Sequence, residues 1–317
     1  MEFKFIEKSD FFKYLPLIED LYRESFNGGK EINYFKWRYL DNPYEDLQII
    51  VALDSGKMAS FYAVSPKEIL FNGEKIKTAI SLNTMTSEKY RGKGLFVTLA
   101  DKLYERMSES GYEMVWGYPN NISHRTFIDK LGWENIYEIP TLEIKKNDIN
   151  LNLLEIDDKI NVLTDDSFDY NYNKLPNVRS NFTVYKDNDI LRWRYLNNPN
   201  NDYFNSCIVR DGLVSSFIVS KIYNQTLNII DYRYSTPEEF FIIFKSILTD
   251  SNYNLIDKIS IWNNISSDIR NRLEKLGFSN NYPIRYFGGK ILNSKVKKND
   301  FINWRNWNLN MGDNNEY

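Results

Sequence analysis

The chain has 317 residues, of which 40 are Lys or Arg and 43 are Asp or Glu, with a formal net charge of −3. This length is comfortable for two domains, and the charge balance gives no overall attraction to nucleic acid or to an anionic membrane. A single cysteine and a single histidine exclude an intrachain disulfide and a Cys- or His-rich metal site, so we expect no metal. No apolar run approaches the length of a membrane span, which predicts a cytoplasmic protein without a membrane partner.

Hydrophobic periodicity in the first half predicts an α+β arrangement around one mixed, largely antiparallel sheet flanked by helices. Pro16 lies inside the first predicted helix and could divide it, because proline has no backbone N–H. The predicted elements are a strand at 3–6, a helix at 11–25, a short helix from Tyr34 that ends before Pro43, strands at 47–53, 58–64, 69–71 and 75–85, a helix from Leu95, a strand at 114–118, a helix at 123–131 and a strand at 133–144.

A tight loop joins the predicted strand that ends near Thr86 to the helix that follows. Its residues are Arg91-Gly92-Lys93-Gly94. Two glycines within three residues let backbone N–H groups converge on an anion, and the next helix presents unpaired amides and its positive dipole end. The spacing fits neither a P-loop nor the dinucleotide-binding fingerprint. Taken alone, the loop predicts either a phosphate site or a plain solvated turn.

A second motif, about thirty residues further on, favours the phosphate site. The segment Asn120-Asn121-Ile122-Ser123 opens a predicted helix, and Lys130-Leu131-Gly132-Trp133 follows that helix. Together with Arg91 and Gly94, these segments resemble the GNAT superfamily of N-acetyltransferases. The acyl-CoA loop of that family reads R/Q-x-x-G-x-G/A, and its next strand-helix unit carries Asn, then Tyr, then K-x-G-F.

The resemblance implies acetyl-CoA as the acyl donor and a small-molecule amine as the acceptor. It places the pantetheine arm along the strand that ends at Thr86 and the pyrophosphate on the loop amides. Two positions depart from the family pattern: Phe96 stands where the loop usually ends in Gly or Ala and should crowd the pyrophosphate, and Ile128 stands where many members have a tyrosine that protonates the departing thiolate. The residues implied in cofactor binding are Met85, Thr86, Arg91, Gly92, Lys93, Gly94, Leu95 and Asn121.

Three residues are candidates for moving protons. Tyr118 follows the strand beside the expected thioester, and it is either the acid that replaces the missing tyrosine or a residue of the wall. His124 belongs to the residue type whose ordinary pKa of about 6.5 suits a general base, and the alternative is a surface or structural histidine. Tyr317 carries the terminal carboxylate, which serves as the base in some related tandem acetyltransferases; the alternative is a disordered tail.

The second half of the chain repeats landmarks of the first. The segment Trp-Arg-Tyr-Leu-x-Asn-Pro occurs at 37–43 and again at 193–199, and the second motif recurs from Asn263. Where the first copy has its glycine loop, the second has no glycine, although Thr236 can cap the helix that Pro237 opens. We therefore predict a GNAT domain at 1–147, a linker at 148–160 and a GNAT-like domain without a phosphate loop at 161–317.

By the resemblance, the leading hypothesis is an acetyl-CoA-dependent N-acetyltransferase that acts on a primary amine of a small polar molecule, with an amino sugar as the preferred acceptor. One alternative is a non-catalytic acyl-CoA-binding or sensor protein, which Phe96 and Ile128 motivate. The other is an aminoacyl-tRNA-dependent transferase of the peptidoglycan-bridge type, against which the intact loop and the lack of a basic excess argue. The sequence leaves the acceptor and the oligomeric state open.

Overall fold

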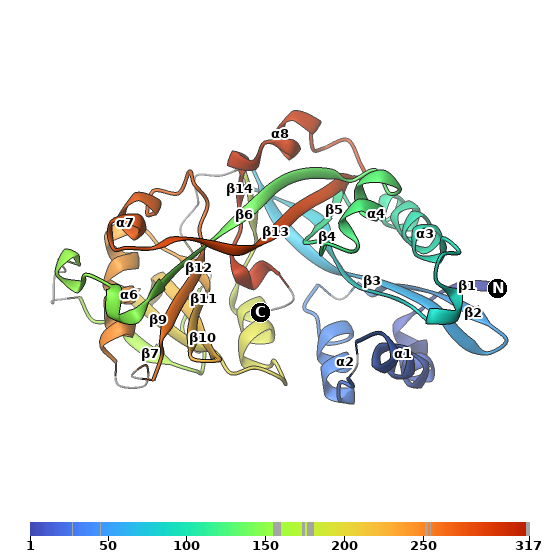
Figure 1. Cartoon of the computed structure of the whole chain (residues 1–317), viewed down its shortest axis with the longest axis horizontal. Helices are drawn as coiled ribbons and strands as arrows, with labels where there is room; N and C mark the ends of the chain where they lie inside the picture. Colours follow the sequence, from blue (N-terminus) through green and yellow to red (C-terminus); the bar gives the residue numbers. More distant parts are fainter. Residues whose placement is uncertain are drawn as a thin grey trace. The chain divides into compact units, whose positions relative to one another are not determined.

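The computed structural model describes residues 1–314 apart from 27, 45, 155–159, 173–174, 176–180, 251–252 and 254. Within these residues the chain forms two compact units. Unit 1 consists of Met1–Tyr137 and Tyr286–Asn306, and unit 2 consists of Glu138–Arg285 and the segment that begins at Trp307. Each unit is built on a mixed sheet with flanking helices, which confirms the predicted α+β fold class (Figure 1).

The sheet of unit 1 has the strand order β1-β2-β3-β4-β5-β13. Neighbouring strands are antiparallel except β4 and β5, which are parallel. Parallel neighbours need a crossover, and here a helix supplies it, so the predicted glycine loop lies at the end of β4. The strands are β1 (Glu2–Phe5), β2 (Gln48–Asp54), β3 (Lys57–Phe71), β4 (Glu74–Thr86), β5 (Met114–Gly117) and β13 (Ser279–Ile291), of which Tyr286 onwards belongs to unit 1.

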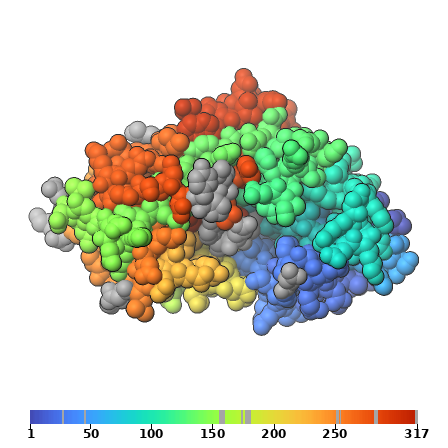
Figure 2. All heavy atoms as spheres, viewed as in Figure 1, coloured from blue at the N-terminus to red at the C-terminus, as the bar shows by residue number. Residues whose placement is uncertain are grey.

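Helices cover both faces of this sheet (Figure 1). The side chains of β3 alternate between the faces: Phe61 and Ala63 join the core under α1 and α2, whereas Tyr62 and Val64 join the core under α3 and α4. Helices α3 and α4 lie at the surface of unit 1, where their atoms are visible in Figure 2. The helices are α1 (Phe11–Phe26), α2 (Ile32–Tyr39), α3 (Leu95–Glu109), α4 (His124–Asp129) and α8 (Lys298–Ile302).

Two prolines are accommodated without a break. Pro16 does not divide α1, because packing of the neighbouring buried side chains Leu15 and Ile18 holds the helix together. The strands predicted at 58–64 and 69–71 are one continuous strand, β3, in which Pro66 pairs with Ala79 of β4. The pairing of β3 with β2 ends at Val64, so proline's missing N–H costs no ladder bond with β2.

Unit 2 repeats this arrangement with the strand order β6-β12-β11-β10-β9-β7, in which β11 and β12 form the parallel pair. A large apolar core packs between its sheet and helices α6 and α7. Its elements are β6 (Glu134–Lys145, from Glu138), β7 (Leu163–Asp165), β8 (Phe182–Val184), α5 (Asn188–Leu191), a π-helical turn (Arg192–Leu196), β9 (Phe204–Arg210), β10 (Leu213–Tyr223), β11 (Thr226–Arg233), α6 (Pro237–Thr249), β12 (Lys258–Trp262), α7 (Arg270–Lys275), β14 (Trp307–Asn308) and the 3₁₀ helix η8 (Met311–Asp313).

The two units are not the consecutive segments 1–147 and 161–317 that we predicted from the sequence. Residues 138–145, expected in the first domain, belong to unit 2 because this part of β6 pairs with β12. Residues 286–306, expected in the second domain, belong to unit 1 because β13 pairs with β5, with Gly289 opposite Trp116. The predicted linker 148–160 falls partly on 155–159, which lie outside the described residues.

Candidate acyl-CoA site

The loop between β4 and α3 has the backbone geometry of an anion cradle. Gly92 and Gly94 have φ angles of +75° and +73°, which L side chains rarely adopt. A Cβ added to either glycine would meet no atom within 4 Å, so the loop backbone faces open space. Arg91 and Lys93 are exposed beside it. The loop therefore offers accessible amides and two cations to a phosphate.

The N-terminus of α3 is open, whereas that of its counterpart α6 in unit 2 is closed. Gly94 is the N-cap of α3, no side chain caps the helix, and no acidic residue lies in its first turn. In α6, the Thr236 hydroxyl accepts a hydrogen bond from the Glu239 N–H, which confirms the predicted cap, and Glu238 and Glu239 lie in the first turn. Carboxylates at that position satisfy the helix dipole and repel an anion. Of these two helices, α3 has the N-terminus that suits a phosphate.

Strands β4 and β5 separate just before this loop. Their pairing ends at Ile80 opposite Trp116. Immediately afterwards β4 has a bulge, because Leu82 and Asn83 together lie opposite Ala63 of β3. A bulge of this kind re-aims backbone N–H groups and marks many functional sites. From Ser81 onwards, one edge of β4 has no strand partner among the described residues and leads towards the glycine loop.

The charged and polar side chains of the loop make only weak contacts within the chain. Arg91 donates from Nε to the Thr86 carbonyl at 3.3 Å and lies 3.4 Å from the Glu88 carboxylate. The Lys93 ammonium lies 4.9 Å from the centre of the Tyr90 ring. Exposed pairs of this kind contribute little to stability. The two cations can therefore turn to a bound anion at small cost.

The two residues predicted to line the pantetheine arm lie at the end of β4. Met85 is buried in the core under α1 and α2, and the Thr86 hydroxyl lies 2.8 Å from the Ser60 hydroxyl. Their side chains are thus occupied, and their carbonyls accept hydrogen bonds from Ser60 and Arg91. Leu95 is buried at the start of α3.

Phe96, which we expected to crowd the pyrophosphate, and Ile128, which stands in place of the usual acid, both face the core. The Phe96 ring contacts the rings of Tyr62 and Phe127, with centroids 5.4 and 5.2 Å away, and Ile128 packs against the same core. The direction of the Phe96 ring, towards Tyr62 and Phe127, leaves the loop backbone uncovered. An aliphatic side chain at position 128 supplies no proton.

Tyr118 and His124 lie near the end of β5 in aromatic surroundings. Tyr118 is half-buried, and its ring lies 5.5 Å from that of Phe287. The His124 ring stacks on Tyr286 at 4.0 Å, and its Nε2 lies 3.3 Å from the Asn135 side-chain oxygen. Both aromatic partners come from β13, which sequence reasoning assigned to the other domain.

The two asparagines of the second motif have different places. Asn121 is exposed in the turn before α4. Asn120 makes the turn, because its side-chain oxygen accepts hydrogen bonds from the backbone N–H groups of Ile122 and Ser123 at 3.1 and 2.9 Å. An exposed Asn121 remains available to a ligand. Tyr317, the third catalytic candidate, lies outside the described residues.

Sequence reasoning missed a line of buried hydroxyls behind β4. The Trp133 indole N–H donates to the Tyr104 hydroxyl at 3.2 Å, the Tyr104 and Tyr62 hydroxyls are 2.9 Å apart, and the Tyr62 hydroxyl donates to Ser81 at 3.0 Å. The residues come from four different elements or loops. Their spacing in the sequence does not indicate these contacts. The one hint is Tyr104, a polar residue within the apolar stripe of its helix.

Burial raises the pKa of Tyr62 to about 12, above the ordinary tyrosine value of about 10. The folded protein therefore keeps this proton at a pH where the unfolded chain loses it, and the associated stability falls as the pH rises from 10 to 12. Between pH 10 and pH 12, the wild type should lose free energy of unfolding as Tyr62 contributes less stability. Tyr62→Phe lacks this contribution, so we expect its loss over the same interval to be smaller by about 2–3 kcal/mol. Urea denaturation at several pH values measures both slopes, and equal slopes would contradict the prediction.

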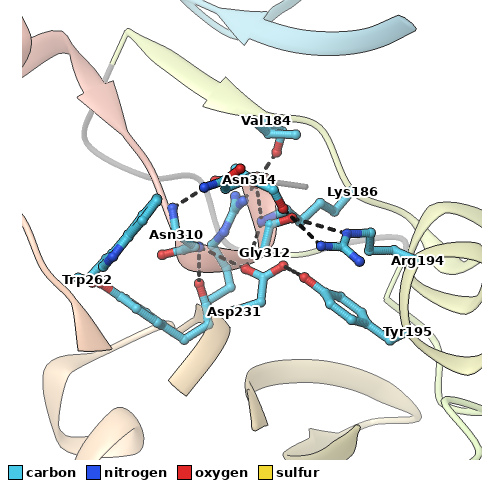
Figure 3. Close-up of polar contacts among 12 residues, drawn as sticks. Val184, Lys186, Arg194, Tyr195, Asp231, Trp262, Asn310, Gly312 and Asn314 are labelled. Carbon is cyan, nitrogen blue, oxygen red and sulfur yellow. Dashed lines mark hydrogen bonds and ion pairs between the residues drawn. The ribbon is translucent and has the colours of Figure 1, made fainter. Parts of the chain in front are cut away.

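In unit 2, the end of β11 corresponds to the free edge of β4, and the C-terminal segment 310–314 covers it. The pairing of β11 with β12 ends at Ile229 opposite Ile261, and β11 likewise has an irregularity at this point. Beyond it, Asp231 is fully buried and accepts hydrogen bonds from Lys186 at 2.7 Å and from Asn310 at 2.8 Å (Figure 3). Segment 310–314 thus covers the end of β11.

Buried charges hold this C-terminal segment. The Lys186 ammonium lies between Asp231 and Asp313, at 2.7 and 2.9 Å from their oxygens, and Arg194 donates to the carbonyls of Gly312 and Asn314 (Figure 3). Burial alone raises the pKa of Asp231, but the Lys186 charge and the donated hydrogen bonds lower it overall. The carboxylate is therefore ionised and paired.

Among the described residues, no group of three or more His, Cys, Asp or Glu side chains is placed to hold a metal ion, and no helix is long and apolar enough to cross a membrane.

Comparison with known proteins agrees with this geometry. No curated protein matches the chain. One structural relative is a probable N-acyltransferase of unknown function from Enterococcus faecalis, with 14% identity, a TM-score of 0.69 and coverage of 92% of this chain and 72% of that one. A GCN5-related N-acetyltransferase from Anabaena variabilis has 14% identity, a TM-score of 0.66 and coverage of 92% and 73%.

A further structural relative is the N-myristoyltransferase of Saccharomyces cerevisiae, solved with bound myristoyl-CoA, with 12% identity, a TM-score of 0.56 and coverage of 91% and 78%. At these identities the structural similarities show the fold. Residues 2–136 match the family model described as acetyltransferase (GNAT) domain. Residues 2–136 of this chain therefore form a GNAT acetyltransferase domain.

Proposed function

We propose that this protein transfers an acetyl group from acetyl-CoA to a primary amine of a small polar molecule, with an amino sugar as the preferred acceptor. One observation carries the proposal: β4 is bulged and, from Ser81 onwards, lacks a strand partner on one edge among the described residues, and a short turn connects it to a loop with two left-handed glycines and an uncapped helix N-terminus. The loop suits a pyrophosphate and the strand edge suits an amide-bearing arm, which are the two chemical parts of the donor.

Each part of the site has a role in this proposal. The backbone amides of Arg91, Gly92, Lys93, Gly94 and Leu95 hold the pyrophosphate, and the two cations add attraction. The backbone of Met85 and Thr86 pairs with the pantetheine arm in the manner of an added strand. Asn121 contacts the cofactor from the turn before α4. Alignment of the two substrates alone can lower the barrier by about 7–11 kcal/mol, so few acid-base groups are required.

Proton transfer is assigned to three candidates. Tyr118 is proposed as the acid, His124 as a base and the terminal carboxylate of Tyr317 as an alternative base. Removal of the last two residues, Glu316 and Tyr317, separates the two bases. If the terminal carboxylate is the base, we expect kcat to fall by at least about tenfold while the KM for acetyl-CoA is unchanged. Steady-state assays measure this, and full turnover in the truncated protein would dispose of Tyr317 and leave His124.

A binding or sensor role is the second candidate function, favoured by the aliphatic Ile128 at the position of the usual acid. The two functions share the cofactor site and differ in turnover. Aminoacyl transfer from tRNA is less consistent with the intact anion loop and the net charge of −3.

Thermal unfolding with and without acetyl-CoA tests the proposal. A ligand at a hundredfold excess over its Kd adds about 2.7 kcal/mol to the free energy of unfolding, which corresponds to several degrees. A panel of amines, led by amino sugars, then follows the release of free thiol. Stabilisation without turnover on any amine would favour the sensor role, and no stabilisation would remove the acyl-CoA site from the proposal.

A further inference from the structure

The line of hydroxyls behind β4 has a fixed direction. The Tyr62 hydroxyl has one hydrogen, and it is donated to Ser81 at 3.0 Å. The hydrogen in the 2.9 Å contact between Tyr62 and Tyr104 must therefore come from Tyr104, whose oxygen in turn accepts the Trp133 N–H. Each donor is polarised by the one behind it. The line ends at the Ser81 hydroxyl, whose own hydrogen makes no contact with any described residue.

Ser81 lies where the two parallel strands separate. It directly follows Ile80, the last residue of β4 that pairs with β5, and directly precedes the bulge at Leu82 and Asn83. On the other strand, a Cβ added to Gly117 would lie 3.3 Å from the Ser81 Cβ, so the two chains are still close at this point. Ser81 is half-buried, and the unpaired edge of β4 begins there. Its hydroxyl is thus at the inner end of the path proposed for the pantetheine arm.

We propose that Ser81 is a catalytic residue that donates a hydrogen bond to the sulfur of the acyl donor. The inference rests on the function proposed above. In acyl transfer the amine nitrogen bonds to the carbonyl carbon, the carbon–sulfur bond breaks and its electron pair goes to sulfur. The nitrogen loses a proton to the base, sulfur takes one from solvent, and Ser81 keeps its own. Ser81 stabilises the charge that develops on sulfur, in place of the tyrosine that Ile128 does not supply.

The tyrosines behind Ser81 suit this role because both stay protonated. Burial raises the pKa of Tyr62 to about 12 and that of Tyr104 well above its ordinary value. At neutral pH each hydroxyl is therefore a donor, and the order of the line follows from the hydrogen that Tyr62 donates to Ser81. The sequence gives Ser81 no motif; only the hydrogen-bond line distinguishes it.

The proposal can be tested without turnover by comparing the affinities for CoA and desulfo-CoA. Calorimetry measures both at pH 9, where much of the free thiol of CoA is ionised. We expect the wild type to bind CoA at least about tenfold more tightly than desulfo-CoA, because desulfo-CoA has no thiolate to accept the hydrogen bond from Ser81. Ser81→Ala should bind the two equally, and Tyr62→Phe should keep part of the preference. Ser60→Ala is the matched control: Ser60 donates a buried hydrogen bond to the Met85 carbonyl at 2.9 Å, so its loss should change both affinities alike.

The outcomes separate the two proposals. If Ser81→Ala keeps the wild-type preference for CoA, or if the wild type has no preference, the role of Ser81 is overturned while the acyl-CoA site stands. If the wild type binds neither ligand, the proposed function falls, and the role of Ser81 falls with it. Where turnover is found, Ser81→Ala should lower kcat on the order of 10²-fold with little change in KM. If Ser81→Ala instead raises KM by a similar factor and leaves kcat unchanged, Ser81 has a role in binding alone, and the proposal is overturned.

Discussion

Gly94→Asp should abolish the stabilisation of the protein by acetyl-CoA. The new carboxylate would stand at the N-cap of α3, beside the amides proposed for the pyrophosphate, and would add both bulk and like charge. At a ligand concentration that adds about 2.7 kcal/mol to the wild type, we expect no measurable gain in the variant. Thermal unfolding with and without the ligand measures the difference.

Gly73→Asp is the matched control for this experiment. Gly73 has a φ of +85° in the turn between β3 and β4, and, like Gly94, it has no atom within 4 Å of an added Cβ. Both variants therefore carry similar backbone strain and the same new charge within unit 1. We expect Gly73→Asp to keep the full response to acetyl-CoA. An unchanged response in Gly94→Asp would mean that the site has been misplaced.

Lys186→Met should cause a large loss of stability in unit 2. The substitution leaves the carboxylates of Asp231 and Asp313 buried beside one another without the cation between them, at 0% and 1% exposure. Breaking a buried pair by removing one partner costs about 3–5 kcal/mol. Chemical denaturation measures the change in the free energy of unfolding, and release of segment 310–314 should appear as new proteolytic sensitivity near the C-terminus.

Two further variants serve as a control and as a partial rescue for Lys186→Met. Lys258→Met removes a more exposed pair with Glu143 in the same unit, at 2.9 Å, and should cost only about 0–1 kcal/mol. Adding Asp313→Asn to Lys186→Met removes one of the two unpaired charges and should recover part of the loss. Stability of Lys186→Met within 1 kcal/mol of the wild type would show that the ion pairs do not hold the segment.

The elements that depend on neighbouring residues could be predicted from the sequence. The glycine loop, its helix and the cap at Thr236 follow from backbone chemistry within a few positions, and the structure confirms the cap directly. The internal repeat likewise predicted the second α+β unit, because a copied pattern of apolar residues folds in the same way.

Features that join distant segments could not be predicted. The return of β13 to unit 1 depends on how two strands share a sheet edge, and no pattern around Gly289 specifies Trp116 as its partner. The line from Trp133 to Ser81 depends on rotamers of four side chains up to 71 positions apart. Segment 310–314 has the composition of a loose tail, yet Met311 and Asp313 are almost completely buried.

The pairing of β13 with β5 sets an order of events during translation. When Tyr137 has left the ribosome, β5 still lacks its neighbour on one side, and that neighbour is complete only at Ile291. At 5–20 residues per second the delay is roughly 8–30 s. During that time the exposed edge of β5 is open to pairing with other chains. The nascent protein is thus most vulnerable to aggregation while its second unit is being made, and chaperones that bind nascent chains should act on it in this interval.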